Sequence, residues 1–121
     1  MTRARVPSLR FEIAAAMLRE GRTVELPALG TSMRPLIAPG GVVRVEPARA
    51  ADVRPGDVVL VDADGSLVCH RLVYLAGGHA VTRGDANPDY DPPRPADAII
   101  GRVPVAPSAH ALYCAVRALL R

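Results

Sequence analysis

The sequence contains no lysine, no tryptophan and only one phenylalanine. With so little aromatic bulk, its hydrophobic core has to be built from Val, Leu, Ile and Ala. All fifteen basic residues are Arg, and they are scattered along the chain without a run of five or more. The net charge of +3 is modest, and aromatic residues are too few to alternate with the Arg residues. We therefore predict no dedicated nucleic-acid groove.

Long apolar runs are also missing. The stretch Ile13–Leu18 holds six apolar residues. A membrane-spanning helix needs ~20, and six are also too few for a convincing secretory signal. We expect a soluble protein, cytoplasmic or at most peripheral to a membrane, with the terminal helices as the surfaces for any lipid or partner-protein contact. Cys69 and Cys114 match no C-x-x-C or zinc pattern, and two thiols buried as small hydrophobic side chains are favoured over a disulfide.

The pattern of turns predicts a mainly β fold in one domain covering residues 1–121. Twelve prolines and ten glycines indicate short elements and frequent turns. Tight turns are expected at 62–65 and 77–78, and a polar, proline-rich loop over 84–95. Strands are expected, within a β core of 23–105, at 23–26, 42–46, 58–61, 67–74, 79–82 and 99–105. Because no βαβ alternation is present, a β domain with a helix at each end is favoured.

A helix is predicted near each end of the chain. Ser8 can cap a helix from Leu9 to Glu20, inside an N-terminal segment of 1–22, and Gly21 can end it. The closing helix falls within 107–121, where apolar residues recur at helical spacing. The face of the first helix that is expected to pack against the core carries Leu9, Ile13, Ala16 and Met17.

The segment from Gly30 to Pro35 has the features of a serine nucleophile's setting. Gly30 lets the backbone take an unusual turn and leaves room for a substrate. Pro35 fixes its own φ and biases Arg34 away from helix, so that the Ser32 hydroxyl sits on a stiff bend. An ordinary turn with a solvated serine is the alternative when the segment is taken alone. The neighbours available to bind the substrate and the oxyanion are Gly30, Thr31 and Met33.

A serine hydroxyl needs a neighbouring base that takes its proton. Because the chain has no Lys, a Ser–Lys dyad is impossible within it, and the base has to be His70, His79, His110 or a carboxylate. Histidine ordinarily titrates near pH ~6.5 and can accept a proton near neutral pH. His79 at a turn and His110 in the closing helix are expected at the surface. Strand alternation places His70, the best candidate, on one face with Val68, Leu72 and Tyr74. A core histidine bonded to a backbone carbonyl is the alternative reading of His70.

A histidine base needs a group that fixes its tautomer and supports the imidazolium. The loop of residues 84–91 offers carboxylates for this purpose, and Asp85 or Asp91 can orient His70. A solvated loop rich in Asp is the alternative.

The same loop also has a partial calcium-loop pattern. Asp85, Asn87 and Asp89 match its first positions. However, Tyr90 stands where a Gly is required and Ala96 where a Glu is required, so the calcium reading is weak. We therefore predict neither a metal site nor another cofactor.

The motifs above occur together in one order between Gly30 and Val103. They are Gly-x-Ser-Met-x-Pro at 30–35, Pro-Gly-Asp at 55–57, His-Arg at 70–71, Gly-Asp-x-Asn at 84–87 with Asp91 further on, and Gly-Arg-Val at 101–103. This ordered set resembles the signal peptidase I superfamily, which also includes the LexA-type self-cleaving repressors. Any one motif is weak evidence, whereas the ordered set is strong.

The resemblance implies roles for individual residues. The Ser before Met is the nucleophile in that superfamily, which here is Ser32. Most bacterial members pair it with a Lys, but the archaeal and endoplasmic-reticulum type has a His in a His-Arg pair, as at His70-Arg71. That branch also carries two Asp residues, one of which supports the His, and Asp85 and Asp91 match their positions, with Asp91 favoured as the residue that orients His70. The repressor-like branch needs an N-terminal DNA-binding domain, for which the 29 residues before Gly30 are too short.

We therefore predict a small serine endopeptidase that cleaves a signal, leader or precursor peptide. Two features depart from signal peptidases: the hydrophobic N-terminal anchor is replaced by a short helix, and Gly30 stands where many members have a hydroxyl residue that helps bind the oxyanion. The alternative is a non-catalytic peptide-binding module on the same fold that acts with a partner enzyme.

Overall fold

The computed structural model describes residues 9–27, 33 and 41–104. The predicted closing helix at 107–121 lies outside these residues. The described elements are α1 (Leu9–Arg19), β1 (Val24–Pro27), β2 (Val42–Pro47), the 3-10 turn η1 (Ala50–Asp52), β3 (Val58–Ala63), β4 (Ser66–Ala76), β5 (His79–Arg83), β6 (Arg94–Pro95), the 3-10 turn η2 (Ala96–Ala98) and β7 (Ile99–Val103). The expected strands are present with small shifts at their ends, and β6 is a short addition inside the predicted loop.

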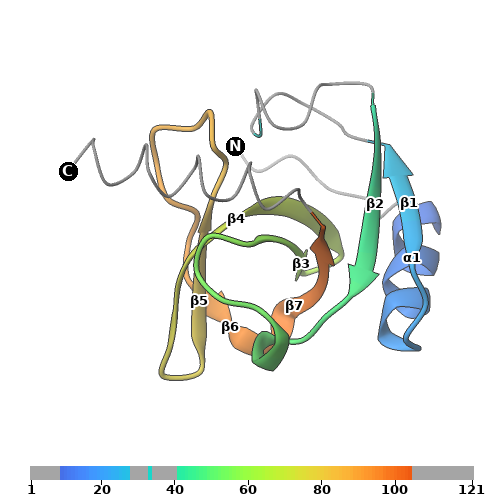
Figure 1. Ribbon diagram of the computed structural model, residues 1–121, viewed down its shortest axis with the longest axis horizontal. Helices are drawn as coiled ribbons and strands as arrows, with labels where there is room; N and C mark the ends of the chain where they lie inside the picture. The colour runs from blue at the N-terminus through green and yellow to red at the C-terminus, as the bar shows by residue number, and fades with distance from the viewer. Residues whose placement is uncertain (1–8, 28–32, 34–40, 105–121) are drawn as a thin grey trace.

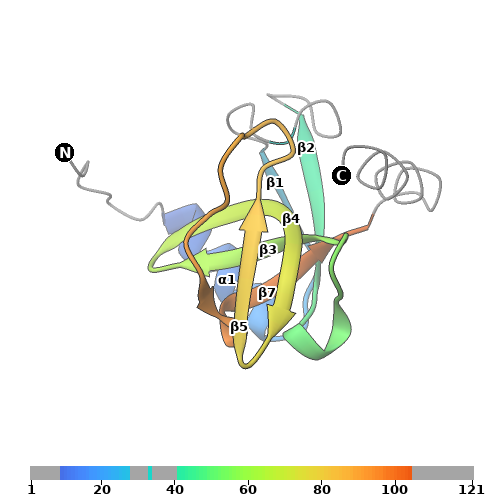
Figure 2. The same cartoon turned by 90° about the vertical axis from the view of Figure 1, so that its left-hand side faces the viewer.

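The strands form one seven-stranded sheet in the order β1-β2-β7-β3-β4-β5-β6. Every neighbouring pair is antiparallel. The sheet curls strongly around itself, and α1 packs beside β1 at one side of it (Figures 1 and 2). The predicted mainly β fold is therefore confirmed. No helix among the described residues is both long and apolar enough to cross a membrane.

Two tight hairpins fix the register of the central strands. Asp64 (φ 55°) and Gly65 (φ 91°) join β3 to β4, with Ala63 paired to Ser66. Gly77 (φ 61°) and Gly78 (φ 77°) join β4 to β5. Positive φ at both central residues is the type I′ geometry whose twist matches that of the flanking strands. Both turns were expected from the sequence, and the register they set decides which side chains of β4 face each other.

The helix α1 packs through a different face from the one predicted. Ala14 and Leu18, four residues apart, are buried, whereas Leu9 and Ile13 are 69% and 51% exposed. Of the predicted face, Met17 alone packs against the core, as a partly buried residue. The small Ala14 side chain allows the helix to approach the strands closely. The helix therefore packs through Ala14 and Leu18, and the neighbouring Ile13 faces outward. The C-terminal end of the helix was predicted to within one residue, and Gly21 just beyond it has the expected positive φ of 88°.

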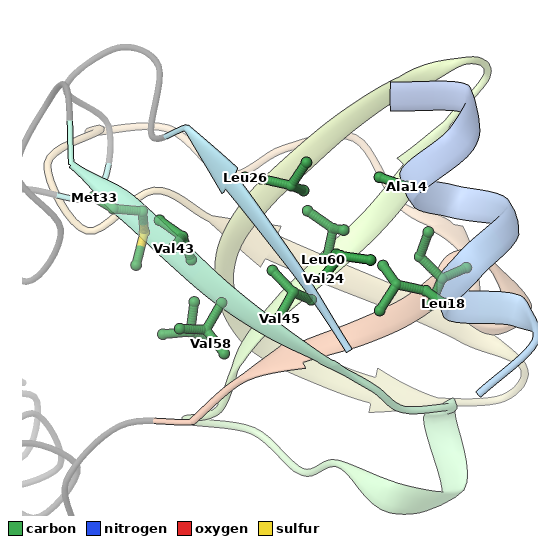
Figure 3. Packing of buried hydrophobic residues seen from close by; sticks show 11 residues of the cluster. Ala14, Leu18, Val24, Leu26, Met33, Val43, Val45, Val58 and Leu60 are labelled. Carbon is green, nitrogen blue, oxygen red and sulfur yellow. The ribbon is translucent and has the colours of Figure 1, made fainter. Parts of the chain in front are cut away.

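Both faces of the central strand β3 are covered. Its residues alternate between two hydrophobic clusters, so the whole run Val58–Val61 is buried. The first cluster, drawn in Figure 3, lies under α1 and contains Ala14, Leu18, Val24, Leu26, Met33, Val43, Val45, Val58, Leu60, Ile100 and Val103. The second cluster lies on the opposite face and contains Ala48, Val53, Val59, Val61, Leu72, Ala80 and Ile99.

The strand β4 does not keep one alternation along its whole length. The register with β5 shifts between Leu72 and Tyr74. As a result Leu72 is fully buried while Tyr74 is 55% exposed. The prediction that Tyr74 shares the face of His70 and Leu72 was therefore wrong, because a strand irregularity inserts an extra residue and turns the following side chain outward.

Gly101 lies where β7 approaches β2 closely in the core. A Cβ atom added there would lie 2.5 Å from Cγ1 of Val45 and 3.2 Å from the carbonyl oxygen of Glu46. Any side chain at this position has to displace a buried valine and the backbone of β2. The glycine of the Gly-Arg-Val motif is thus a packing requirement of the β2–β7 pair.

We expect Gly101→Ala to lower the free energy of unfolding by about 1–3 kcal/mol, the usual cost of overpacking a core. Urea denaturation followed by circular dichroism measures this change. Adding Val45→Ala removes the closer of the two contacts, so the double variant should lose less stability than the sum of the two single variants. Strictly additive losses would show that the contact with Val45 is not the cause.

Candidate active site

The strand β4 presents two consecutive polar side chains to opposite sides of the sheet. His70 pairs across the strands with Val59, and Arg71 pairs with Val58. Cross-strand partners share a face, so His70 lies on the face of the second cluster and Arg71 on the face of the first. Each of these side chains is hydrogen-bonded to a carboxylate of the loop that follows β5.

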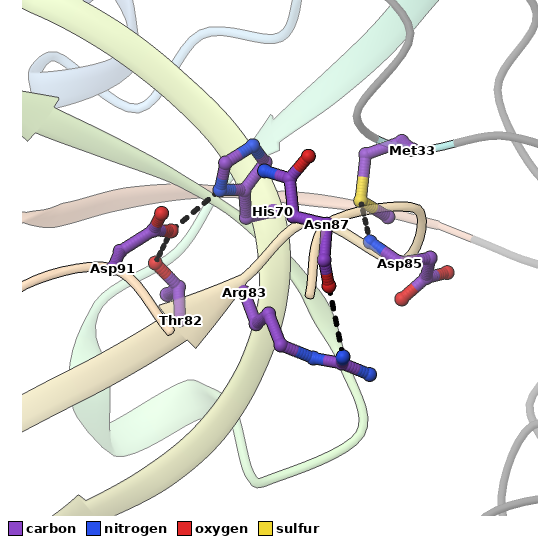
Figure 4. A network of polar contacts seen from close by, with 7 residues as sticks. All are labelled: Met33, His70, Thr82, Arg83, Asp85, Asn87 and Asp91. Atoms are coloured by element: carbon purple, nitrogen blue, oxygen red, sulfur yellow. Dashed lines mark hydrogen bonds and ion pairs between the residues drawn. The ribbon is translucent and has the colours of Figure 1, made fainter. Parts of the chain in front are cut away.

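His70 is hydrogen-bonded to Asp91. The distance between His70 Nδ1 and Asp91 Oδ2 is 2.5 Å, and the two side chains are 12% and 23% exposed. The Thr82 hydroxyl donates to the same Oδ2 atom over 2.7 Å. Figure 4 shows the imidazole and the threonine hydroxyl converging on this carboxylate. The bond orients the ring and directs Nε2 away from Asp91.

Arg71 is held by a fork of hydrogen bonds to Asp85. Nε lies 3.2 Å from Oδ1 and Nη2 lies 2.6 Å from Oδ2, and Nη1 also donates to the carbonyl of Gly56 over 2.9 Å. The Arg71 side chain is only 4% exposed. A buried guanidinium with two-point carboxylate contact is a rigid anchor, because removing either partner leaves an uncompensated charge.

The same Asp85 contacts Met33, which belongs to the segment predicted to carry the nucleophile. Its backbone N–H donates to the sulfur of Met33, with 3.4 Å between N and Sδ (Figure 4). Met33 is itself 5% exposed and belongs to the first cluster. The residue that follows Ser32 in the chain is therefore fixed against the loop that supplies both carboxylates.

The loop between these carboxylates is folded back on β5. Arg83 Nη1 donates to the carbonyl of Asn87 over 2.9 Å, and its guanidinium lies 5.8 Å from the centre of the Tyr90 ring. The Asn87 N–H in turn donates to the carbonyl of Gly84 over 2.9 Å. These contacts tie the middle of the loop to the end of β5.

The predicted site residues fall into three groups. His70 is bonded to Asp91, and Met33, which belongs to the first cluster on the face of Arg71, lies in the same close view (Figure 4). Asp85 lies in the same loop as Asp91, but its carboxylate pairs with Arg71. The sequence had also allowed Asp85 to bond to His70. Arg71 and His70 point to opposite faces of the sheet, and Asp85 is on the face of Arg71. The remaining candidates, Gly30, Thr31, Ser32 and His110, lie outside the described residues. His79 is exposed at its turn, as expected, with Nδ1 3.0 Å from the carbonyl of Gly77.

Sequence reasoning missed Thr82. The signal available was a hydroxyl residue on a strand whose alternate position, Ala80, is apolar, which indicates a polar group facing inward. A calcium loop at Asp85, Asn87 and Asp89 was the weak alternative for this segment of the sequence. Among the described residues, no three or more His, Cys, Asp or Glu side chains are grouped so as to hold a metal ion.

Cys69 is the other nucleophilic side chain beside His70. It is a free thiol that packs against the first cluster. Burial raises the pKa of this thiol from 9.0 to about 11, and the nearby positive charge of Arg71 only partly opposes the shift. A reactive cysteine requires a lowered pKa. Cys69 is therefore a structural thiol.

A curled antiparallel sheet that carries an oriented histidine is compatible with hydrolysis of the serine-peptidase type. Residues 4–104 match the family described as Peptidase S24-like. Because the match covers most of the chain, the protein belongs to this family, in the LexA- and signal-peptidase-like superfamily predicted from the motifs. Membership supports a peptidase-type function, and the Ser-His branch within the superfamily stays a prediction. No curated protein matches the sequence.

The raised pKa of Cys69 predicts its reactivity. In a Cys114→Ser variant, so that Cys69 alone reports, we expect negligible alkylation by iodoacetamide at pH 8 in the folded protein and rapid alkylation in urea. The unfolded thiol ionises above about pH 9.0 while the folded one stays protonated to about pH 11. Stability should therefore fall as the pH rises through this window. Rapid alkylation of the folded protein at pH 8 would contradict the burial of this thiol.

Breaking the Arg71–Asp85 pair should be costly. We expect Asp85→Asn to lower the free energy of unfolding by about 3 kcal/mol, at the lower end of the range for breaking a buried pair, because Asn still accepts one hydrogen bond. Urea denaturation measures the change. The control is Arg19→Gln, which breaks the more exposed Arg19–Asp62 pair of 2.8 Å and should cost at most ~1 kcal/mol. Equal losses in the two variants would show that Arg71 needs no charged partner.

Proposed function

We propose that this protein is a serine endopeptidase in which Ser32 is the nucleophile, His70 the general base and Asp91 the residue that orients the base. The observation that carries the proposal is the hydrogen bond between His70 Nδ1 and Asp91 Oδ2, at 2.5 Å. A partly buried carboxylate at Nδ1 is the arrangement that fixes the imidazole tautomer and supports the imidazolium formed during proton transfer.

The proposed reaction follows from the two ring nitrogens. With Nδ1–H directed at Asp91, Nε2 accepts the proton of the Ser32 hydroxyl as its oxygen attacks the scissile carbonyl. His70 then returns that proton to the leaving amine, and the C–N bond breaks to leave an acyl-enzyme. Water attacks this ester in the same way and releases the second product. Backbone N–H groups of the segment from Gly30 to Met33, Ser32 and Thr31 included, would bind the oxyanion.

The position of Met33 supports Ser32 as the partner of His70. Ser32 is bonded to Met33, and consecutive Cα atoms are only about 3.8 Å apart. Met33 contacts Asp85, which belongs to the loop that also supplies Asp91. The absence of Lys from the chain supports the same pairing, since it leaves histidine as the ordinary base for a serine nucleophile. These points favour the Ser-His branch of the superfamily, which resembles the archaeal and endoplasmic-reticulum signal peptidases.

The substrate class we propose is a peptide or protein segment bound in extended form along a strand edge, since sheet edges bind peptides through main-chain hydrogen bonds. By analogy with signal peptidases, small residues would flank the cut. Signal, leader or precursor segments are the natural members of this class.

A peptide library read by mass spectrometry tests the proposal. We expect the wild-type protein to cleave a subset of peptides and Ser32→Ala to cleave none. His70→Gln should lose about 10²–10⁴-fold in rate, the usual contribution of a general base. The matched controls are Ser66→Ala, in the β3–β4 hairpin, and His79→Gln, at an exposed turn, both of which should cleave as wild type does.

Two outcomes would contradict the proposal. Cleavage that survives Ser32→Ala would remove Ser32 from the mechanism. Tight binding of peptides by both proteins without any cleavage would identify a peptide-binding module on the peptidase fold.

A further inference from the structure

We propose that Thr82 is a positioning residue of this centre: its hydroxyl sets the direction of the Asp91 carboxylate and, through it, the tautomer of His70. The inference rests on the proposed function for its catalytic consequence. Its structural content, the coupling of Thr82 to the imidazole, can be measured without any substrate.

The strand register places Thr82 on the face of His70. Thr82 on β5 pairs directly with Leu72 on β4, and His70 lies two residues before Leu72 on the same face. His70 and Thr82 are thus diagonal neighbours across the two strands, a separation that a third side chain can bridge. Asp91 enters between them and bonds to both (Figure 4).

Thr82 holds Asp91 at two points. The Asp91 N–H donates to the carbonyl of Thr82 over 2.8 Å, which fixes the backbone. The Thr82 hydroxyl donates to Oδ2 over 2.7 Å, which fixes the carboxylate plane. Thr82 is only 6% exposed, so water has poor access to this hydroxyl. The terminal torsion of an aspartate is soft, and without the hydroxyl the Asp91 carboxylate keeps fewer restraints on its rotation.

The two hydrogen bonds to one oxygen also determine where the proton of a neutral imidazole lies. A carboxylate oxygen accepts and does not donate. A carboxylate at Asp91 therefore obliges the His70 nitrogen beside Oδ2 to donate, so Nδ1 carries the proton, and the Thr82 hydroxyl acts by holding Oδ2 in that position. Nε2 is then the nitrogen with the lone pair, which is the tautomer that a general base for Ser32 requires.

The loop is held by several contacts besides this hydroxyl, among them the Asp91 N–H bond to the Thr82 carbonyl. Arg83 holds the loop separately through the Asn87 carbonyl and the Tyr90 ring, and Asp85 anchors its start on Arg71. Removing the Thr82 hydroxyl should therefore leave the loop in place while releasing the carboxylate. This separation lets a positioning role be distinguished from a structural one.

The first measurement is the rate at which a fluorophosphonate probe labels Ser32. The Ser32 oxygen bonds to phosphorus, the P–F bond breaks, fluoride leaves, and the hydroxyl proton passes to His70. We expect Thr82→Val, which keeps the shape and loses the hydroxyl, to slow labelling by about 10-fold, in line with the loss of a hydrogen bond to a charged group. Thr82→Ser keeps the hydroxyl and should restore most of the rate. The control is Thr23→Val, the same change at an exposed position, which should label as wild type does.

The second measurement needs no activity. The ¹⁵N chemical shifts of the His70 ring report its tautomer directly, and the low-field Nδ1 proton reports the bond to Asp91. We expect Thr82→Val to lose the low-field signal and to mix the tautomers, and Thr82→Ser to preserve both. Should Thr82→Val fail to fold, Thr82→Ala replaces it, because Ala and Ser both lack the methyl group and differ only in the hydroxyl.

The outcomes separate this inference from the proposed function. Identical His70 spectra and labelling rates in Thr82→Val (or Thr82→Ala) and Thr82→Ser would overturn the role of Thr82 and leave the peptidase proposal intact. Labelling that persists in Ser32→Ala would overturn the peptidase proposal, while the His70 spectra still decide whether Thr82 sets the tautomer.

Discussion

The buried guanidinium of Arg71 is the constraint around which this region of the fold is arranged. Its side chain is 4% exposed, and a charge so far from water is tolerated only when it is fully paired. Asp85 and the Gly56 carbonyl supply those partners, so the start of the loop after β5 is anchored to β4. Strand alternation places His70 on the other face of β4. The same loop therefore supplies Asp85 to Arg71 on one face and Asp91 to His70 on the other.

The end of the loop is fixed by a different set of contacts. Thr82 and Arg83, the last residues of β5, bond to Asp91 and Asn87 respectively. Within the described part of the chain, every buried polar side-chain atom has a hydrogen-bond partner. A fully satisfied polar network of this kind is rigid, because each group can leave its place only by exposing an unpaired partner. Rigidity suits the roles proposed for His70 and Asp91, since a general base and its orienting carboxylate act through fixed geometry.

The sequence predicted the β architecture and its turns because these depend on local chemistry. Gly77-Gly78 and Asp64-Gly65 are residue types that tolerate positive φ, and they adopt it at the two turns that join β3, β4 and β5. The packing face of α1 was predicted wrongly because it depends on which side chain is small enough to approach the sheet, a property of the surface opposite. Tyr74 was misplaced for a related reason, since the irregularity beside Leu72 leaves no clear mark in the sequence.

The partners of the two loop aspartates also depend on the fold as well as on the local sequence. Asp85 and Asp91 are both carboxylates of one loop, and the sequence favoured Asp91 for His70 without showing the partner of Asp85. They differ because residue 71 is an arginine on the opposite face, which takes the nearer carboxylate and leaves the farther one to the imidazole. The pair His70-Arg71 thus selects the roles of the two acids by alternation alone. A lysine base needs no acid to fix a tautomer, whereas a histidine base does. Two independent observations therefore support the proposal that His70 is the base. One is the contact of Asp91 with His70, and the other is the absence of lysine from the chain.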